Sequence, residues 1–392
     1  MHQNALTMEP QPQPLPPEVL PSGVRSRFVD GVNGLTMHVL EAGFEEPGRP
    51  SVLLLHGFPE LAYSWRRVLP ALADAGYHAI APDQRGYGRT TGWDPDYDGD
   101  LRSFRLLNLV RDAVGLLAAL GIGHVNAVVG HDFGSPVAAW CALLRPDVFR
   151  SVVLMSAPFA GPPQLSLGAS QLGGAATRLS EMNEQLAALR WPRQHYQWYY
   201  TTRQANDDMW RCEQGVHAFL RAYYHHKSAD WKDNHPHPLH AWSANELAHM
   251  PTYYVMERGQ TMAQTVAVEM PGDAEIAACA WLPERELQVY SLEYQRNGFQ
   301  GGLQWYRCAT DAACIAELQI FSGRSIDVPS LFVAGASDWG VFQKPGDFEA
   351  MQTSACTRML GCELLDGAGH WVQQEQSAAV SRLLLDFLQA AV

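Results

Sequence analysis

The sequence is poor in charge, and the charge that it has is mostly negative. Only 18% of its 392 residues are charged, below the roughly 25% that is typical of soluble domains. The 28 basic residues are outnumbered by 41 acidic ones, which gives a formal net charge of −13. A surface of this sign repels polyanions, so nucleic acid and anionic membranes are not expected as partners.

Signals for secretion and membrane insertion are also missing. No apolar run is long enough to span a bilayer, and residues 1–24 lack the apolar stretch of a signal peptide. That segment is rich in Pro and Gln, and we expect it to be a disordered lead-in. The seven cysteines include no C-x-x-C pair, which favours reduced thiols over disulfides or a zinc site. These absences predict a soluble, cytoplasmic protein.

Motifs of several other chemistries are absent. There is no G-x-S-x-G for an acyl-transfer serine and no G-x-G-x-x-G for a dinucleotide. Five histidines do cluster, but their spacing fits no metal-ligand pattern, and the Asp, Pro and Asn around them indicate an exposed loop: His225, His226, His235, His237 and His240. We therefore expect neither a metal nor a cofactor.

What the chain does contain is enough apolar sequence, 47%, to bury a large core. Short apolar runs alternate with helical patterns such as 101–120, which is typical of parallel strands joined by crossover helices. The expected strands are 51–55, 79–81, 125–129, 152–155, 331–333 and 362–365. Residues 25–43 alternate as an antiparallel hairpin does. The pattern predicts an α/β core with a mostly parallel sheet.

The strand rhythm stops between residues 161 and 309, where Trp, Tyr, His and Met accumulate. Because strands resume afterwards, this segment is interpreted as an inserted, mainly helical cap over the strand ends. The core would then comprise residues 25–160 and 310–392.

The strongest chemical signal is Gly130-His131-Asp132-Phe133-Gly134, between a predicted strand and a predicted helix. A sharp turn flanked by glycines is the context of a nucleophile elbow, which pushes its central side chain beyond the sheet edge. Here that side chain is the carboxylate of Asp132. The following helix N-terminus favours its anionic, nucleophilic form.

Two further motifs follow strand ends in the order expected of a catalytic triad. Asp338 comes after strand 331–333 and His370 after strand 362–365, so Asp338 can orient His370 as a base on water. His56-Gly57-Phe58-Pro59-Glu60 follows the first core strand. The N–H groups of Phe58 and Phe133 are the candidate oxyanion donors.

Taken together, these runs resemble the epoxide hydrolases of the α/β-hydrolase superfamily, of the soluble or microbial type. The resemblance is carried by HGFPE at 56–60, SWR at 64–66, APDQRGYG at 81–88, GHDFGS at 130–135, SAPF at 156–159, SDW at 337–339 and GHW at 369–371.

The resemblance implies a helical lid over an α/β sheet and two lid tyrosines that hold the epoxide oxygen. Tyr306 in W-Y-R matches one, and Tyr196 in Y-Q-W-Y the other, with Tyr199 and Tyr200 as alternatives one turn away. The residues expected to contact the substrate are Trp305, Pro59, Trp371 and Trp198. The implied partners are a small hydrophobic epoxide and water, for a monomer or a homodimer.

Other functions share parts of this pattern. Haloalkane or haloacetate dehalogenases use the same aspartate, but a halide needs N–H donors, and Phe133 beside the nucleophile offers no side-chain donor. Paired tyrosines suit an alkoxide better. A non-catalytic receptor on this fold usually lacks a triad member, whereas all three are present. An interaction module built on the aromatic insert would produce no diol from an epoxide.

Overall fold

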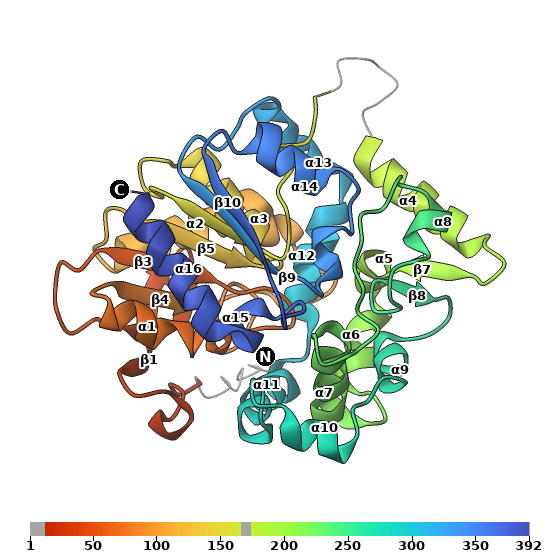
Figure 1. Cartoon of the computed structure of the whole chain (residues 1–392), viewed down its shortest axis with the longest axis horizontal. Helices are drawn as coiled ribbons and strands as arrows, with labels where there is room; N and C mark the ends of the chain where they lie inside the picture. Colours follow the sequence, from red (N-terminus) through yellow and green to blue (C-terminus); the bar gives the residue numbers. More distant parts are fainter. Residues whose placement is uncertain (1–11, 166–173, 392) are drawn as a thin grey trace, which may run out of the picture.

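An eight-stranded sheet lies at the centre of the protein and carries the predicted site. The structure is a computed structural model that describes residues 12–165 and 174–391 (Figure 1). In sheet order the strands are β1 (Val24–Val32), β2 (Leu35–Ala42), β4 (His78–Pro82), β3 (Ser51–Leu55), β5 (Ala127–His131), β6 (Val152–Met155), β9 (Ser330–Gly335) and β10 (Met359–Leu365). The pairs β1–β2 and β2–β4 are antiparallel and the others are parallel. The predicted mostly parallel α/β core is confirmed.

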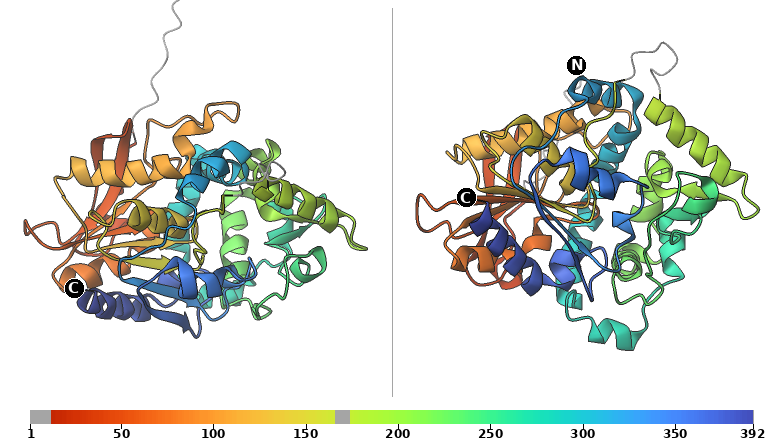
Figure 2. Two further views of the ribbon diagram at one scale, coloured as in Figure 1. Left: turned by 90° about the horizontal axis from the view of Figure 1, so that it is seen from above. Right: turned by 45° about the horizontal axis from the view of Figure 1, so that its top comes forward.

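Helices cover both faces of this sheet, as the alternating sequence pattern predicts. Helices α1 (Val68–Asp74) and α16 (Ser377–Ala390) lie side by side on one face, and α2 (Leu106–Ala119) and α3 (Gly134–Leu144) on the other (Figure 2). The apolar positions of α2 that recur every three or four residues are buried against the core. Two short helices, α14 (Asp347–Ala350) and α15 (Val372–Glu375), precede α16.

Several predicted boundaries differ from the observed ones. The last strand, expected at 362–365, begins three residues earlier at Met359. The strand expected at 125–129 forms two residues later and includes His131, while Val125 pairs in an isolated bridge with Phe149. The helix expected at 101–120 is split by Arg105, whose backbone is extended (φ −63°, ψ 147°). The 3₁₀ turn Leu101–Phe104 therefore precedes α2 as a separate element.

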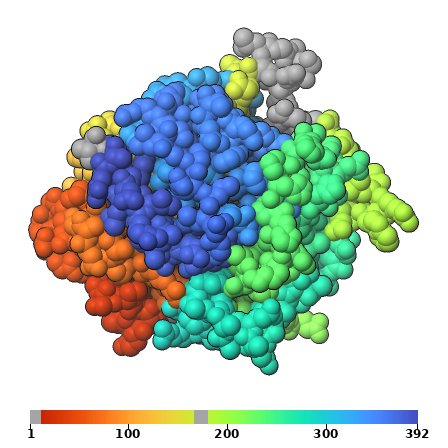
Figure 3. All heavy atoms as spheres, in the orientation of Figure 1, coloured from red at the N-terminus to blue at the C-terminus, as the bar shows by residue number. Residues whose placement is uncertain are grey.

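Residues between β6 and β9 fold over the carboxyl ends of the parallel strands. Their helices are α4 (Gly174–Ala187), α5 (Tyr196–Tyr200), α6 (Gln204–Trp210), α7 (Gly215–Lys227), α8 (Ala244–Leu247), α9 (Met262–Ala267), α10 (Asp273–Ala278), α11 (Glu284–Asn297), α12 (Gln300–Thr310) and α13 (Ala312–Leu318). A short antiparallel ribbon, β7 (Arg193–His195) with β8 (Val255–Glu257), joins them. We call this segment the cap. Figure 3 shows cap residues in green packed directly against the C-terminal core segment in blue.

The start of the chain differs from the expected disordered lead-in. Residues 1–11 lie outside the described residues, but from Leu15 onward the chain packs on the core. The N–H of Leu15 donates to Ser26 Oγ at 2.7 Å, and the Leu15 side chain is buried. Val19 accepts a hydrogen bond from the Tyr63 hydroxyl. Apolar residues between the prolines therefore hold this segment against the core. The Pro- and Gln-rich composition of the segment does not reveal these contacts.

No helix within residues 12–165 and 174–391 has the length and apolarity needed to traverse a bilayer. The cytoplasmic location expected from the sequence stays a prediction. All seven cysteines are free thiols, and Cys141, Cys308 and Cys356 are buried.

Candidate active site

The turn between β5 and α3 places Asp132 above the sheet edge. Asp132 has a positive φ of 52°, a strained conformation that L-residues adopt at functional turns. A Cβ on Gly130 would lie 2.0 Å from the carbonyl oxygen of Gly134, and one on Gly134 would lie 2.4 Å from that of Leu55. Only glycine fits at either position, which is why the predicted elbow forms with this sequence.

The three predicted triad residues come together from three separate loops. His370 Nε2 lies 3.2 Å from Asp132 Oδ2, and His370 Nδ1 lies 3.1 and 3.3 Å from the two carboxylate oxygens of Asp338. Asp338 also accepts the N–H of Gly340 at 2.7 Å. The imidazole is therefore held between a carboxylate on the cavity side and a buried carboxylate behind it.

Charges on these groups depend on one another. Burial opposes ionisation of Asp132, but the hydrogen bond and the charge of His370 outweigh it and hold the pKa of the carboxyl well below its usual range. Burial and the ammonium of Lys227 lower the pKa of His370. The carboxylates of Asp338 and Asp132 raise it by more, so the pKa of His370 lies above its ordinary value. Asp132 is thus ready to act as an anionic nucleophile.

The N–H of Phe58 donates to Asp132 Oδ1 at 2.9 Å. This approach requires Gly57, because a Cβ there would lie 2.3 Å from Asp132 Cβ. The predicted oxyanion donor Phe58 is therefore already aimed at the carboxylate. Phe133, the other predicted donor, precedes α3, and its ring lies edge-on to Tyr306 with centroids 5.1 Å apart. The role of the Phe133 N–H stays a prediction.

A cavity of about 360 Å³ opens in front of Asp132. Tyr196 from α5 and Tyr306 from α12 line it with Asp132, and their ring centroids are 6.0 Å apart. Burial, and then the charge of Asp132, raise the pKa of both phenols well above the ordinary value. Both phenols therefore keep their protons and can donate hydrogen bonds into the cavity.

The alternatives to Tyr196 are directed elsewhere. The hydroxyl of Tyr199 donates to Asp208 Oδ2 at 2.9 Å, and that of Tyr200 bonds the Tyr223 hydroxyl at 3.2 Å. Neither residue is among those that line the cavity. Tyr199 and Tyr200 lie three and four positions after Tyr196, and the rings of Tyr196 and Tyr200 are 5.5 Å apart, so it is the bonding of their hydroxyls that distinguishes them from Tyr196.

Comparison with known proteins agrees with this geometry. A family model for the alpha/beta hydrolase fold matches residues 50–376. Epoxide hydrolase A of Mycobacterium tuberculosis is 34% identical over 369 residues, which covers 92% of this chain and 96% of that protein. An epoxide hydrolase from Caballeronia sordidicola is 31% identical, with 91% and 92% covered. The chain belongs to the epoxide hydrolase family of α/β hydrolases.

Solved structures of epoxide hydrolases have the same fold. The epoxide hydrolase from an endophytic Streptomyces superimposes with a TM-score of 0.74 at 32% identity, covering 94% of this chain and 96% of that one. Potato epoxide hydrolase I superimposes with a TM-score of 0.71 at 28% identity, covering 94% and 99%. The resemblance seen in the sequence motifs therefore extends through the whole epoxide hydrolase fold.

Within this epoxide hydrolase, the four residues expected to contact substrate separate into two groups. Trp305 lines the cavity, although its indole N–H is bonded to the Arg85 carbonyl. Pro59, Trp198 and Trp371 are not among the residues that line this cavity, and their contact with substrate stays a prediction.

Trp371 shows why sequence neighbourhood misleads here. It is fully buried, and its indole N–H donates to the Tyr224 carbonyl at 2.8 Å. Its ring packs on that of Tyr224 with centroids 4.4 Å apart. Trp371 therefore joins the cap to the loop that carries His370 and stays away from the cavity.

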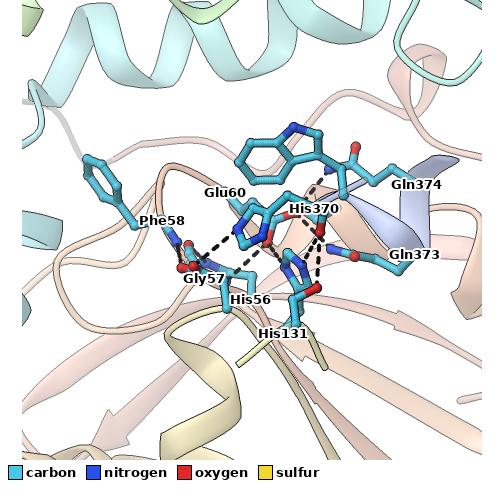
Figure 4. Close-up of polar contacts among 12 residues, drawn as sticks. His56, Gly57, Phe58, Glu60, His131, His370, Gln373 and Gln374 are labelled. Carbon is cyan, nitrogen blue, oxygen red and sulfur yellow. Dashed lines mark hydrogen bonds and ion pairs between the residues drawn. The ribbon is translucent and has the colours of Figure 1, made fainter. Parts of the chain in front are cut away.

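A buried polar network behind the triad was missed by the sequence analysis. Glu60 Oε2 lies 2.5 Å from His131 Nδ1, and His131 Nε2 lies 2.7 Å from the His370 carbonyl oxygen (Figure 4). The amides of Gln373 and Gln374 donate to Glu60 Oε1 at 2.8 and 3.0 Å. Glu60 belongs to the HGFPE motif and His131 to the GHDFGS motif, but the spacing of the two motifs does not indicate that these side chains meet.

The histidine cluster in the cap is not one exposed loop. His225 and His226 belong to α7, and burial lowers the pKa of His226 to about 3. His235, His237 and His240 are exposed. The helix continues further than the surrounding polar residues suggested, because Tyr223 and Tyr224 anchor its last turn in the core.

Proposed function

We propose that this site hydrolyses an epoxide to a vicinal diol through a covalent ester on Asp132. The observation that carries the proposal is the arrangement around the cavity. An anionic carboxylate faces two protonated phenols across the cavity, and a histidine paired with a second carboxylate lies 3.2 Å behind it. The relatives named above are epoxide hydrolases, which also favours this reaction over dehalogenation.

In the first step, Asp132 Oδ2 attacks a ring carbon from the side opposite its C–O bond. A carbon–oxygen bond forms to Asp132 as the ring bond breaks, and the departing oxygen takes a proton from Tyr306 or Tyr196. Protonation is needed because an alkoxide is a poor leaving group. Asp132 Oδ1, held by the Phe58 N–H, becomes the ester carbonyl oxygen.

In the second step, His370 accepts a proton from water as the water oxygen attacks the ester carbon. The charge that develops on Oδ1 is stabilised by the Phe58 N–H, with that of Phe133 as the second expected donor. Asp338 stabilises the imidazolium. The tetrahedral intermediate expels the diol oxygen, which takes the proton held by His370. Asp132 is then a carboxylic acid that carries one oxygen from water. Its proton is lost to solvent and a proton is regained by the phenolate that step one left on Tyr306 or Tyr196, so the carboxylate and both phenols are restored.

A trapping experiment tests the covalent step. With His370→Gln, ring opening continues but ester hydrolysis stops, so mass spectrometry of the intact protein should show an adduct heavier by the mass of a styrene-type epoxide. Asp132→Asn should form neither adduct nor diol. No adduct on His370→Gln would overturn the two-step scheme.

Isotope labelling provides a second, independent test. After a single turnover in ¹⁸O-water, the label should be found in the peptide that contains Asp132, because the incoming oxygen enters the carboxylate. Label found only in the diol would instead mean that water attacks the epoxide directly.

A further inference from the structure

The cap contributes one buried cation that the mechanism above does not use. Lys227 is the last residue of α7, and its side chain is only 2% exposed. Within residues 12–165 and 174–391 its ammonium forms no ion pair and donates no hydrogen bond. A lysine is rarely this enclosed without a carboxylate beside it, so the groups around its ammonium bear on what the charge does.

Aromatic rings take the place of a counter-ion around this ammonium. Lys227 Nζ lies over four rings, at 4.8 Å from the centroid of Tyr254, 5.3 Å from Tyr223, 5.5 Å from Trp371 and 5.6 Å from Tyr253. The π faces attract a cation without neutralising it. The positive field of Lys227 therefore persists in a region where little water screens it.

The cation lies next to the catalytic histidine. The His370 N–H donates to the Lys227 carbonyl oxygen at 2.8 Å, so the two backbones are joined directly. Both side chains contact the ring of Trp371, whose centroid is 4.7 Å from that of His370 and 5.5 Å from Lys227 Nζ. Lys227 does not line the substrate cavity, so any effect on the reaction passes through its neighbours.

His370 needs such a neighbour because carboxylates surround it. Two of them, Asp132 and Asp338, contact the imidazole and favour its protonated form, which cannot accept a proton from water. Other titratable groups surround the two side chains. The ring of His131 on β5 packs on that of His370, and Glu60 contacts His131 from behind. Glu375 on α15 binds the backbone N–H groups beside His370. Around Lys227 lie the phenols of Tyr223, Tyr253 and Tyr254, and His226 contacts Tyr253.

We propose that Lys227 is a positioning residue whose caged ammonium keeps His370 in its neutral, proton-accepting form during ester hydrolysis. The inference rests on the proposed function, since it needs His370 to act as the base. Its direction agrees with the lowering effect that Lys227 has on the pKa of His370. Once Asp132 is esterified, it no longer carries a negative charge. Asp338 is then the one contacting carboxylate that still favours protonated His370, and Lys227 opposes it.

The test separates the two half-reactions as a function of pH. Rapid quenching and intact mass give the rates of ester formation and ester decay with styrene oxide between about pH 5 and 9. Removing the cation in Lys227→Met or Lys227→Gln should move the acidic limb of ester decay to higher pH by about one unit, a tenfold loss of rate below the limb. Ester formation should keep its pH profile.

Two control variants separate charge from structure. Lys227→Arg keeps the cation inside the cage and should retain the wild-type limb. Lys232→Met removes an exposed lysine of the following segment and should change neither rate. A limb that stays in place in both neutral variants would overturn the proposal, as would loss of the folded state in both, because the ammonium would then serve stability rather than His370. Absence of any ester in the wild-type protein would instead overturn the proposed function.

Discussion

A phenol that is buried beside a carboxylate holds its proton more tightly than one in water, and two such phenols face Asp132. Both phenols are protonated before the reaction, and each can donate its proton to the epoxide oxygen as the ring opens. For Tyr196 the hydroxyl also contacts Gln343 Oε1 at 3.4 Å and accepts from Gln197 Nε2 at 3.2 Å. These contacts hold the phenol ring of Tyr196 in place.

The first prediction concerns these hydroxyls. We expect Tyr306→Phe and Tyr196→Phe each to slow ester formation by about 10²-fold, because one of the two proton donors to the alkoxide is lost. The matched control is Tyr199→Phe, whose hydroxyl is bonded to Asp208 and faces away from the cavity. Single-turnover rates of ester formation measure the effect. Unchanged rates in Tyr306→Phe would remove that residue from the site.

The second prediction concerns pH. The lowered pKa of Asp132 means that its nucleophilic anion persists well below pH 3.8, so ester formation should not lose rate between about pH 8 and 5 through this group. Ester hydrolysis requires neutral His370, so its rate should fall as the pH drops. Stopped-flow measurement of the two steps checks this, and an acidic limb in ester formation alone would contradict it.

The same shifts have stability consequences of opposite sign. The pKa of His370 is raised in the folded protein, so its contribution to stability is present below about pH 6.5 and is lost as the pH rises through the folded value. The pKa of Asp132 is lowered, so its contribution is present above about pH 3.8 and is lost as the pH falls through the folded value. The pair therefore favours folding at intermediate pH.

At the scale of elements, the loop from β10 to α15 is held by one carboxyl group. Glu375 accepts the N–H groups of Gly369 at 2.9 Å and Trp371 at 3.0 Å, on either side of His370. It also accepts the N–H of Ala229 in the cap at 2.8 Å. Burial raises the pKa of Glu375 to about 8, although the three amide bonds oppose that shift. This side chain therefore ties the histidine loop to the segment that follows α7.

The third prediction tests this tie. In Glu375→Gln an amide NH₂ replaces one acceptor oxygen and meets a backbone N–H, so we expect a loss of about 1–3 kcal/mol in the free energy of unfolding. Ester hydrolysis should slow more than ester formation, because His370 serves only the second step as a base. Denaturant unfolding and single-turnover kinetics measure the two effects. Glu363→Gln on the exposed side of β10 is the control, and equal behaviour of the two variants would refute the role.

At the scale of the whole molecule, a buried arginine joins cap and core. Arg66 follows the core turn Ala62–Trp65, is 1% exposed and pairs with Glu286 of α11 at 2.6 Å. Its guanidinium also donates to Gln374 Oε1 at 2.7 Å and to the Trp281 carbonyl at 3.0 Å. Removing one partner of such a pair leaves a buried charge without compensation, which is costly.

The fourth prediction follows from this contact. We expect Glu286→Ala to lower the free energy of unfolding by about 3 kcal/mol. Arg66 would stay buried but lose the one carboxylate that it pairs with among the described residues of the cap. Glu363→Ala, at an exposed position, should change stability by less than about 0.5 kcal/mol. Urea unfolding of both variants gives the comparison. A loss as small as that of the control would show that the pair adds little to cap docking.

Several features could be predicted from the sequence because they are local. Short apolar runs indicate strands, and apolar side chains that recur every three to four residues indicate helices. The strands predicted at 51–55 and 152–155 match the observed strands residue for residue. The elbow was recognisable because its turn requires glycine at 130 and 134, whatever surrounds it. Asp338 and His370 follow strand ends, and parallel strands bring their carboxyl ends to one edge of the sheet.

What the tertiary structure alone decided is which side chains face the cavity and which groups share a buried charge. Trp371 stands beside His370 in the chain, yet its ring packs on that of Tyr224 in the cap. Glu60 meets His131 across 71 positions, and Lys227 reaches His370 across the boundary between cap and core. Electrostatic effects depend on distance and burial in three dimensions, and neither quantity is encoded in the spacing of residues along the chain.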